Sequence, residues 1–320
     1  MARPAEPQTS SSVLMIRPFR FQSNPQTAES NRFQQQDHSP GDDLIHEKAL
    51  AEFNNLVATL EAVGIDVMVF DDTPEPHTPD AIFPNNWLST HADGTAVLYP
   101  MMASNRRPER REDILSSLSA DHGFRIEQTI DLSSFEADEK FLEGTGSIVL
   151  DRENHIAYAC QSARTNPDLL AEFARRTDYE LVVFDALGED GAAIYHTNVV
   201  LCIGQDFAVI CAECINGGQR QSVLNRLHDT GHEVIDISYA QMASFAGNML
   251  ELKSTNGGRI LAMSSQALNS LTAEQRKTLS RRTHIVAASI DTIEKSAGGS
   301  VRCMLAEIHL PKKPGSQDSE

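Results

Sequence analysis

The chain has 320 residues, 40% of them hydrophobic and 22% charged, a composition typical of a globular protein with a large buried core. The formal net charge of −18 argues against a nucleic-acid partner, because binding phosphates requires a basic surface. No window approaches the ~18 uninterrupted apolar residues of a membrane span, so we expect no membrane partner either.

Both ends of the chain are polar. We predict disordered tails over residues 1–11 and 312–320, flanking a single domain over residues 12–311. The N-terminus lacks an apolar run of signal-peptide type, and the chain carries an odd number of cysteines, five. Both features predict a cytoplasmic location with reduced thiols.

A repeated unit organises the rest of the chain: two strand-like runs joined by a short turn, then a helical run, then another apolar strand. In its first copy, residues 87–100 form the two runs, with a hairpin turn at Asp93-Gly94. A helix over about 108–121 and a strand over 125–132 complete this copy. Further copies span residues 146–187, 197–238 and 248–290.

The fifth copy can be completed only by joining the two ends of the chain. Residues 300–310 and 12–19 supply its first two runs, and residues 44–63 and 66–72 supply the helix and the last strand. Five copies of similar length predict a closed α/β ring in preference to an open α/β sheet. In such a ring the first residues of each hairpin face the central axis, so side chains distant in sequence converge there.

Cys303 is a candidate nucleophile in the segment AGGSVRC, where Gly298 and Gly299 allow a tight turn. A cysteine ahead of an apolar strand is commonly a buried apolar residue, and it becomes reactive only where a histidine and a carboxylate reach it. His196, in YHTNV, and Glu143, in LEGTGS, stand at the equivalent place in two other units. We therefore predict a catalytic group of Cys303, His196 and Glu143.

Five short segments occur in order along the chain: PDAIFPNNW, LEGTGS, RTN, YHTNV and GGSVRC. They resemble, in order and placement, those of the guanidino-group modifying enzymes, which comprise arginine deiminases, dimethylarginine hydrolases and amidinotransferases. The similarity covers nearly the whole chain and is greatest for the citrulline-utilisation hydrolase (CtlX) branch, whose members carry FPNNW, YHTNV and FAGNM. It implies a five-bladed pseudo-symmetric α/β propeller with a central active site and no metal or other cofactor. It also implies that Cys303 is the nucleophile, His196 the general acid and base, and Glu143 the acid that pairs with the histidine.

The resemblance also implies several substrate contacts. Asp80 matches an acid that the dimethylarginine hydrolases hold near the substrate. Arg164 and Arg106 match arginines that hold the substrate α-carboxylate, a group that a planar guanidinium binds through two hydrogen bonds. Arg107, next in the chain, is an equal candidate for the place of Arg106.

Asparagines stand in place of acids at two positions of the predicted site. The deiminases and dimethylarginine hydrolases generally have an aspartate at the position of Asn86, and many relatives have one at Asn198. An amide offers a donor and an acceptor to a neutral ureido group, whereas a buried carboxylate favours a cation. Asn85 is a second amide able to donate to a developing oxyanion. Asn24 and Asn248 either bind substrate or cap backbone turns.

We therefore expect a hydrolase that converts citrulline to ornithine, ammonia and carbon dioxide through an S-carbamoyl intermediate on Cys303. Two alternatives stay open. Asp80 and Glu143 leave negative charge at the site, which suits arginine or a dimethylarginine-type substrate. A propeller without catalytic activity would instead be a binding module. The expected partner is a small ureido or guanidino amino acid, and association into a homo-oligomer is also open.

Overall fold

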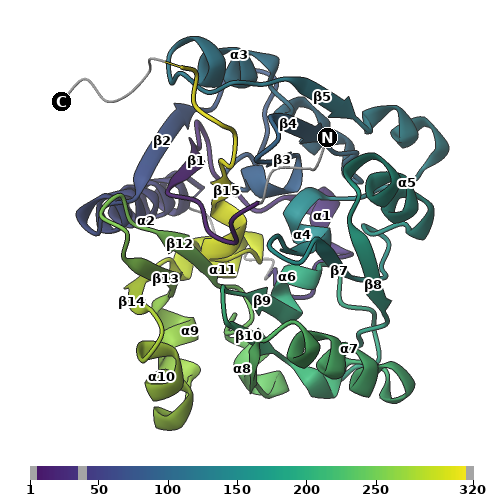
Figure 1. Ribbon diagram of the computed structural model, residues 1–320. Coiled ribbons are helices and arrows are strands. Elements are labelled where there is room, and N and C mark those ends of the chain that lie inside the picture. Colours follow the sequence, from purple (N-terminus) through teal and green to yellow (C-terminus); the bar gives the residue numbers. More distant parts are fainter. Residues whose placement is uncertain (1–5, 35–41, 315–320) are drawn as a thin grey trace.

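The computed structural model describes residues 6–34 and 42–314 and confirms the predicted ring of five α/β units. Five three-stranded sheets surround a central axis, with helices on the outside (Figure 1). In every sheet the middle strand pairs antiparallel with one neighbour and parallel with the other. A hairpin followed by a helical crossover produces this pattern, so each sheet is one blade of a propeller.

The two ends of the chain share one blade, as predicted. β1 (Ser12–Arg17) pairs antiparallel with β15 (Ala306–Glu307) and parallel with β2 (Asp66–Asp71). Two helices, α1 (Pro25–Ala28) and α2 (Asp42–Ala62), lie between β1 and β2 in the chain. The pairing of β15 with β1 therefore closes the ring without a covalent link.

The other four blades follow in chain order. The second contains β3 (Leu88–Thr90), β4 (Thr95–Leu98), α3 (Glu112–Ala120) and β5 (Gln128–Asp131). The third contains β6 (Val149–Asp151), β7 (Ile156–Cys160), α5 (Pro167–Thr177) and β8 (Glu180–Phe184). The fourth contains β9 (Leu201–Ile203), β10 (Phe207–Ile210), α7 (Gly217–Asp229) and β11 (Glu233–Asp236). The fifth contains β12 (Leu250–Lys253), β13 (Arg259–Ser264), α9 (Ser265–Ser270), α10 (Ala273–Ser280) and β14 (His284–Ala288).

Short helical turns lie at the entrance to the blades. Four of them directly precede the first strand of a blade: η1 (Pro84–Asn86), α4 (Gly144–Ser147), α6 (Thr197–Val200) and η5 (Val301–Met304). The others are η2 (Ser104–Glu109), η3 (Ser133–Asp138), η4 (Ala212–Cys214), α8 (Tyr239–Ala243) and α11 (Asp291–Ala297). Because the first strands of neighbouring blades contact one another, the four turns converge near the axis.

Local sequence accounts for most element boundaries. Gly94 has φ of +88° at the predicted hairpin turn, a conformation that glycine adopts without steric cost. The helix expected from residue 108 begins only at Glu112, because Pro108 lies in the separate turn η2 and Arg110 is extended. α5 has Asn166 as its N-cap and Pro167 as its first residue, the order that helix starts favour.

Part of the predicted N-terminal tail is ordered, which corrects the expectation for residues 6–11. Glu6 forms a buried ion pair of 2.6 Å with Arg152, and the Gln8 amide donates to the carbonyls of Leu150 and Ile203 at 3.0 and 3.1 Å. These polar side chains are satisfied by the ring instead of by water, which composition alone does not reveal. Residues 312–314 are described as well, with Lys312 beside Phe124. Residues 1–5 and 315–320 lie outside the described part.

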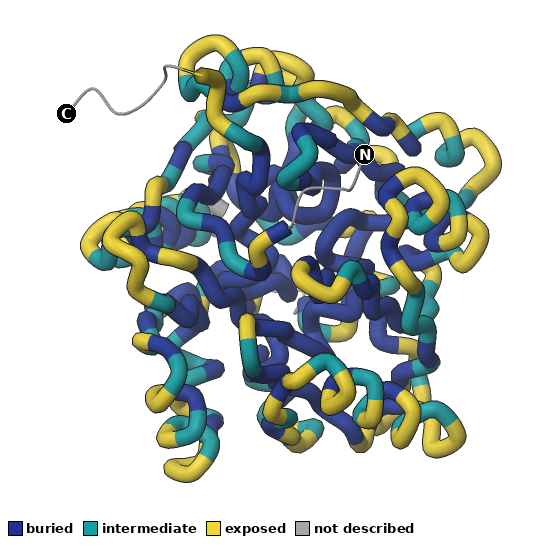
Figure 2. The backbone as a smooth tube through the Cα atoms, in the orientation of Figure 1, coloured by how far each residue is buried: buried dark blue, intermediate teal, exposed yellow. Residues whose placement is uncertain are grey.

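Burial follows the ring (Figure 2). The backbone around the axis is buried, while the outer helices and loops carry most of the exposed residues. Within the described ranges, no helix combines the length and the apolar character that crossing a membrane demands. The buried axis therefore holds polar residues whose presence needs a functional or structural reason.

Candidate active site

A small cavity, of about 10 Å³, lies where the axial turns meet. Six of the predicted site residues line it: Asp80, Asn86, Arg106, Arg164, His196 and Cys303. Other lining residues, among them Thr27, Phe83, Tyr195 and Gly299, were not expected from the sequence. Three blade entrances supply lining side chains, namely Asn86, His196 and Cys303. Glu143 and Asn248, from the other two entrances, contact His196 and Cys303, so all five entrances converge as the repeat predicted.

Glu143 and His196 form the central hydrogen bond of the site. The Glu143 Oε2 atom lies 2.8 Å from His196 Nε2, and both side chains are buried. Two glycines allow α4 to pack closely against η1 and His196. A Cβ atom on Gly144 would lie 2.2 Å from the Asn85 carbonyl oxygen, and one on Gly146 would lie 2.8 Å from His196 Nδ1. The segment LEGTGS therefore needs glycine at both places.

The electrostatics of this pair favour a charged acid beside a neutral base. Burial would raise the pKa of Glu143, but the Arg164 guanidinium at 3.2 Å and the His196 hydrogen bond hold it well below its usual range. Burial lowers the pKa of His196 to about 4, and Glu143 only partly opposes this effect. His196 is therefore neutral at pH 7 and able to accept a proton at Nδ1, since Nε2 is bound to Glu143.

Cys303 lies on η5 with its sulfur atom held by two amides. Asn198 Nδ2 and Asn248 Nδ2 each donate to Cys303 Sγ at 3.4 Å. Asn248 also accepts from the backbone N–H of Arg302 and donates to the carbonyl of Asn198 at 2.9 Å. Asn248 therefore joins the turn that carries Cys303 to the neighbouring blade, and both amides contact the sulfur atom. The two amides therefore fix the position of the Cys303 sulfur atom.

Arg106 takes a different place from the one expected of a residue that holds the substrate carboxylate. Its Nε and Nη2 atoms donate to the two oxygens of Glu109 at 2.9 and 2.8 Å, and all of these groups are buried. Its Nη1 atom donates to Asn86 Oδ1 at 2.9 Å. Sequence reasoning missed Glu109, although its spacing of three residues from Arg106 is that of an ion pair within one helical turn.

This contact determines the orientation of the Asn86 amide. A guanidinium can only donate hydrogen bonds, so the oxygen of Asn86 must face Arg106 and the nitrogen must face away. Asn86 Nδ2 is buried without a partner among the described residues. A ligand atom in the cavity that accepts a hydrogen bond would satisfy it.

Asp80 offers the opposite group to the cavity. Its Oδ2 atom accepts from Asn24 Nδ2 at 2.7 Å, whereas its buried Oδ1 atom has no partner in the described ranges. Asn24 does not line the cavity. Its side-chain oxygen caps α1 by accepting from the backbone N–H of Gln26, and its side-chain nitrogen donates to Asp80. The structure therefore places Asn24 as a cap and a support, one of the two possibilities left open by the sequence.

Three other predicted residues lie around the cavity. Arg164 donates to Glu143 and to the Ser30 hydroxyl and stacks 5.0 Å from the Tyr195 ring centre, so its guanidinium is already held. Asn85 is fully buried, and neither polar atom of its amide has a partner among the residues described, but it does not line the cavity. Arg107 donates to the Met101 carbonyl outside the cavity.

Comparisons with known proteins identify a family for this chain and other proteins with its fold. A family model described as "N,N dimethylarginine dimethylhydrolase, eukaryotic" matches residues 17–310. Among solved structures, the N-terminal domain of ArgZ covalently bound to a reaction intermediate matches with a TM-score of 0.71 and 18% identity, over 94% of this chain and 99% of that one. ArgZ is described as an arginine dihydrolase from the ornithine–ammonia cycle in cyanobacteria.

Two more structures share the fold. Unliganded AgrE matches with a TM-score of 0.72 and 17% identity, over 95% of this chain but only 40% of AgrE. A dimethylarginine dimethylaminohydrolase adduct with S-methyl-L-thiocitrulline matches with a TM-score of 0.61 and 14% identity, over 93% and 99% of the two chains. A search of curated proteins found no match. Since the family model covers most of the sequence, the chain belongs to the N,N-dimethylarginine dimethylhydrolase family, whose members hydrolyse guanidino C–N bonds.

Proposed function

We propose that this enzyme hydrolyses the ureido group of citrulline, with Cys303 as nucleophile, His196 as general acid and base, and Glu143 as the group that orients His196. The observation that carries the proposal is the orientation of Asn86, whose amide nitrogen is left to donate because Arg106 occupies its oxygen. A neutral ureido oxygen accepts such a hydrogen bond. A guanidinium, which has donors only, would oppose it.

The Asp80 carboxylate at the cavity suits the same class of substrate. Asp80 Oδ1 is an unpartnered acceptor, which an N–H of the ureido group or the α-ammonium group would satisfy. The cavity thus presents one donor, from Asn86, and one acceptor, from Asp80. Because both atoms are buried, leaving them unpaired in the complex would cost about 1–3 kcal/mol each, which favours a ligand that pairs with both.

The reaction requires only groups of this chain and water. His196 accepts the proton of the Cys303 thiol, and the resulting thiolate adds to the ureido carbon. The oxygen of the tetrahedral species is stabilised by Asn86 Nδ2. The bond to the side-chain nitrogen of ornithine then breaks as protonated His196 delivers a proton to that nitrogen, leaving an S-carbamoyl group on Cys303. His196 next accepts a proton from water, which attacks the carbamoyl carbon and releases the thiolate. The freed carbamate decomposes to ammonia and carbon dioxide, so citrulline and one water yield ornithine, ammonia and carbon dioxide.

Arginine is the second candidate substrate. ArgZ is described as an arginine dihydrolase, and an AgrE variant is described in complex with L-arginine, which supports this alternative by similarity of fold. Asp80 and Glu143 also supply the negative charge that a guanidinium requires. On this alternative, Asn86 would donate to the ureido oxygen only after the first ammonia has been lost.

Product analysis separates the candidates. Purified full-length protein is incubated separately with citrulline, arginine and N,N-dimethylarginine, and ornithine, citrulline and ammonia are quantified over time. We expect ornithine and ammonia in equal amounts from citrulline, and none with Cys303→Ser. Accumulation of citrulline from arginine, without ornithine from either substrate, would refute the proposal. A lack of turnover with all three substrates would favour the non-catalytic alternative.

A further inference from the structure

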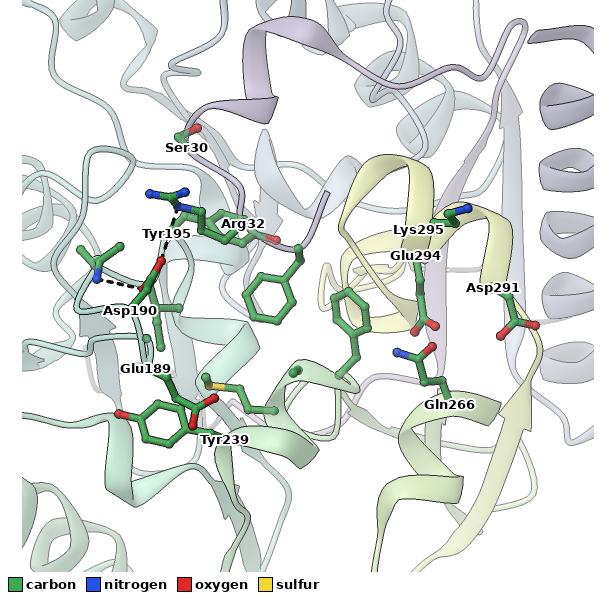
Figure 3. A pocket seen from close by; sticks show the side chains of 18 residues that line it. Ser30, Arg32, Glu189, Asp190, Tyr195, Tyr239, Gln266, Asp291, Glu294 and Lys295 are labelled. Atoms are coloured by element: carbon green, nitrogen blue, oxygen red, sulfur yellow. Dashed lines mark hydrogen bonds and ion pairs between the residues drawn. The ribbon is translucent and has the colours of Figure 1, made fainter. Parts of the chain in front are cut away.

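A second and larger pocket, of about 620 Å³, is drawn in Figure 3. It adjoins the catalytic cavity, since Tyr195 lines both. Its walls come from the loop over residues 188–195, from α8 and from α11, together with residues near Phe33. Its volume is in the range of pockets that bind small molecules. The groups assigned to catalysis lie in the smaller cavity, so this pocket has no role in the proposed reaction.

Glu294 is the unusual residue of this pocket. Its side chain is only 2% exposed, and its Oε1 atom accepts a hydrogen bond from the Ser300 hydroxyl. Its Oε2 atom is buried and has no hydrogen-bond partner at normal distance in the part of the chain that the structure describes, and the Ser264 hydroxyl is its polar neighbour. Figure 3 shows the carboxyl group beside the amide of Gln266 at one end of the pocket. Burial raises the pKa of Glu294 to about 7, the response of a carboxylate that lacks a cation.

The rest of the lining indicates a cationic ligand. Four acidic residues line the pocket together with two basic ones. Asp190 pairs with Arg32 at 3.8 Å, which leaves Glu189, Asp291 and Glu294 with one further base, Lys295. Phe33 and Phe245 also line the pocket, with ring centres 5.3 Å apart, whereas the Tyr195 ring already holds the Arg164 guanidinium. Aromatic faces and a buried carboxylate together attract organic ammonium or guanidinium groups.

The pocket also contacts both segments that carry the catalytic groups. Ser300, held by Glu294, accepts the backbone N–H of Cys303 at 2.9 Å through its carbonyl oxygen. Tyr195 lines both cavities, directly precedes His196, and donates its hydroxyl to the Gly298 carbonyl at 2.7 Å. A ligand in the pocket would therefore contact groups that position the nucleophile and the base.

We infer that this pocket is a second binding site, for a small organic cation whose N–H group donates to Glu294 Oε2, and that its occupancy alters the activity of Cys303. The ligand class follows from the unpartnered buried oxygen, the excess of acids and the aromatic walls. The coupling follows from the Glu294–Ser300–Cys303 contacts. The site is independent of the identity of the substrate.

The test uses 1,4-diaminobutane as probe, because it carries two ammonium groups and lacks the carboxylate of an amino acid. Its binding to the full-length protein is measured by isothermal titration calorimetry. Glu294→Gln keeps an acceptor for Ser300 but removes the charge, and we expect it to weaken binding about tenfold or more. Asp291→Asn removes the same charge from an exposed residue of the same helix and pocket, and we expect a change of less than about threefold.

Two further measurements make the inference refutable. Asn86→Asp adds a carboxylate to the catalytic cavity, so a large gain in probe affinity in this variant would mean that the probe binds there instead. In the kinetic arm, the probe should change kcat/KM of the wild-type enzyme about fivefold or more and leave that of Glu294→Gln unchanged. Equal binding to the wild type and Glu294→Gln would refute the site, and binding without a kinetic effect would refute the coupling.

Discussion

Asn86→Asp tests the basis of substrate choice directly. The substitution replaces the Asn86 amide nitrogen, a buried donor, with a carboxylate oxygen, while the other oxygen can keep the 2.9 Å contact with Arg106. A carboxylate in this place opposes a ureido oxygen and attracts a guanidinium. We therefore expect the variant to use citrulline less well and arginine better, relative to the wild type.

The magnitude follows from the lost donor. Removing one hydrogen-bond donor to a developing oxyanion lowers kcat by roughly 10²–10³, or about 3–4 kcal/mol in transition-state stabilisation. The gained carboxylate is partly neutralised by Arg106, so the benefit for arginine is smaller. The ratio of kcat/KM for citrulline to that for arginine should therefore fall by about 10² or more.

The assay measures kcat/KM for both substrates in the wild type, Asn86→Asp and Asn85→Asp. Asn85→Asp is the matched control: it makes the same change at the neighbouring residue, which is fully buried but does not line the cavity. We expect it to lower stability while leaving the substrate ratio within about threefold. A ratio in Asn86→Asp that stays within the same limits, or an equal loss for both substrates, would refute the reasoning.

The remaining predictions concern catalysis and stability. Cys303→Ser should release no ornithine and should show no substrate-derived mass increase in intact-protein mass spectrometry; residual turnover would exclude the proposed nucleophile. Because burial lowers the pKa of His196 to about 4, the acidic limb of kcat/KM should lie near that pH and not near about 6.5. Because this pKa is lowered, the contribution of His196 to stability is present above about pH 6.5 and is lost as the pH falls towards 4. The difference between the urea midpoints of the wild type and His196→Gln should therefore shrink over the same pH range. Glu294 has a raised pKa, so its contribution is lost as the pH rises from about 4.5 through about 7; Glu294→Gln should have a higher urea midpoint than the wild type at about pH 8 and an equal one at about pH 4. Gln8→Ala removes three buried hydrogen bonds, to Leu150, Ile203 and Arg152, and should lower the free energy of unfolding by about 1–3 kcal/mol; a change below about 0.5 kcal/mol would show that residues 6–11 do not stabilise the ring.

The larger features of this protein follow from local sequence. Alternating apolar runs, the Asp93-Gly94 turn and helical periodicity define five units, and the closed ring follows because each unit must bury its apolar faces against neighbours. The equivalent positions of Glu143, His196 and Cys303 at the blade entrances could also be predicted from the sequence, because repeated segments take equivalent places in the ring. What repeats in the chain therefore determined the architecture and the candidate catalytic group.

Only the tertiary structure decided how the polar groups divide their hydrogen bonds. Arg106 and Asn24 have residue types suited to holding a substrate, but Glu109 occupies the first and the cap of α1 occupies the second. Residues 6–11 have the composition of a disordered tail, but Arg152 and the carbonyls of two blades satisfy their polar groups. The sequence states which hydrogen bonds a side chain can form, whereas its actual hydrogen-bond partner depends on contacts between residues far apart in the chain. The orientation of Asn86, on which the proposed substrate depends, is decided in this way.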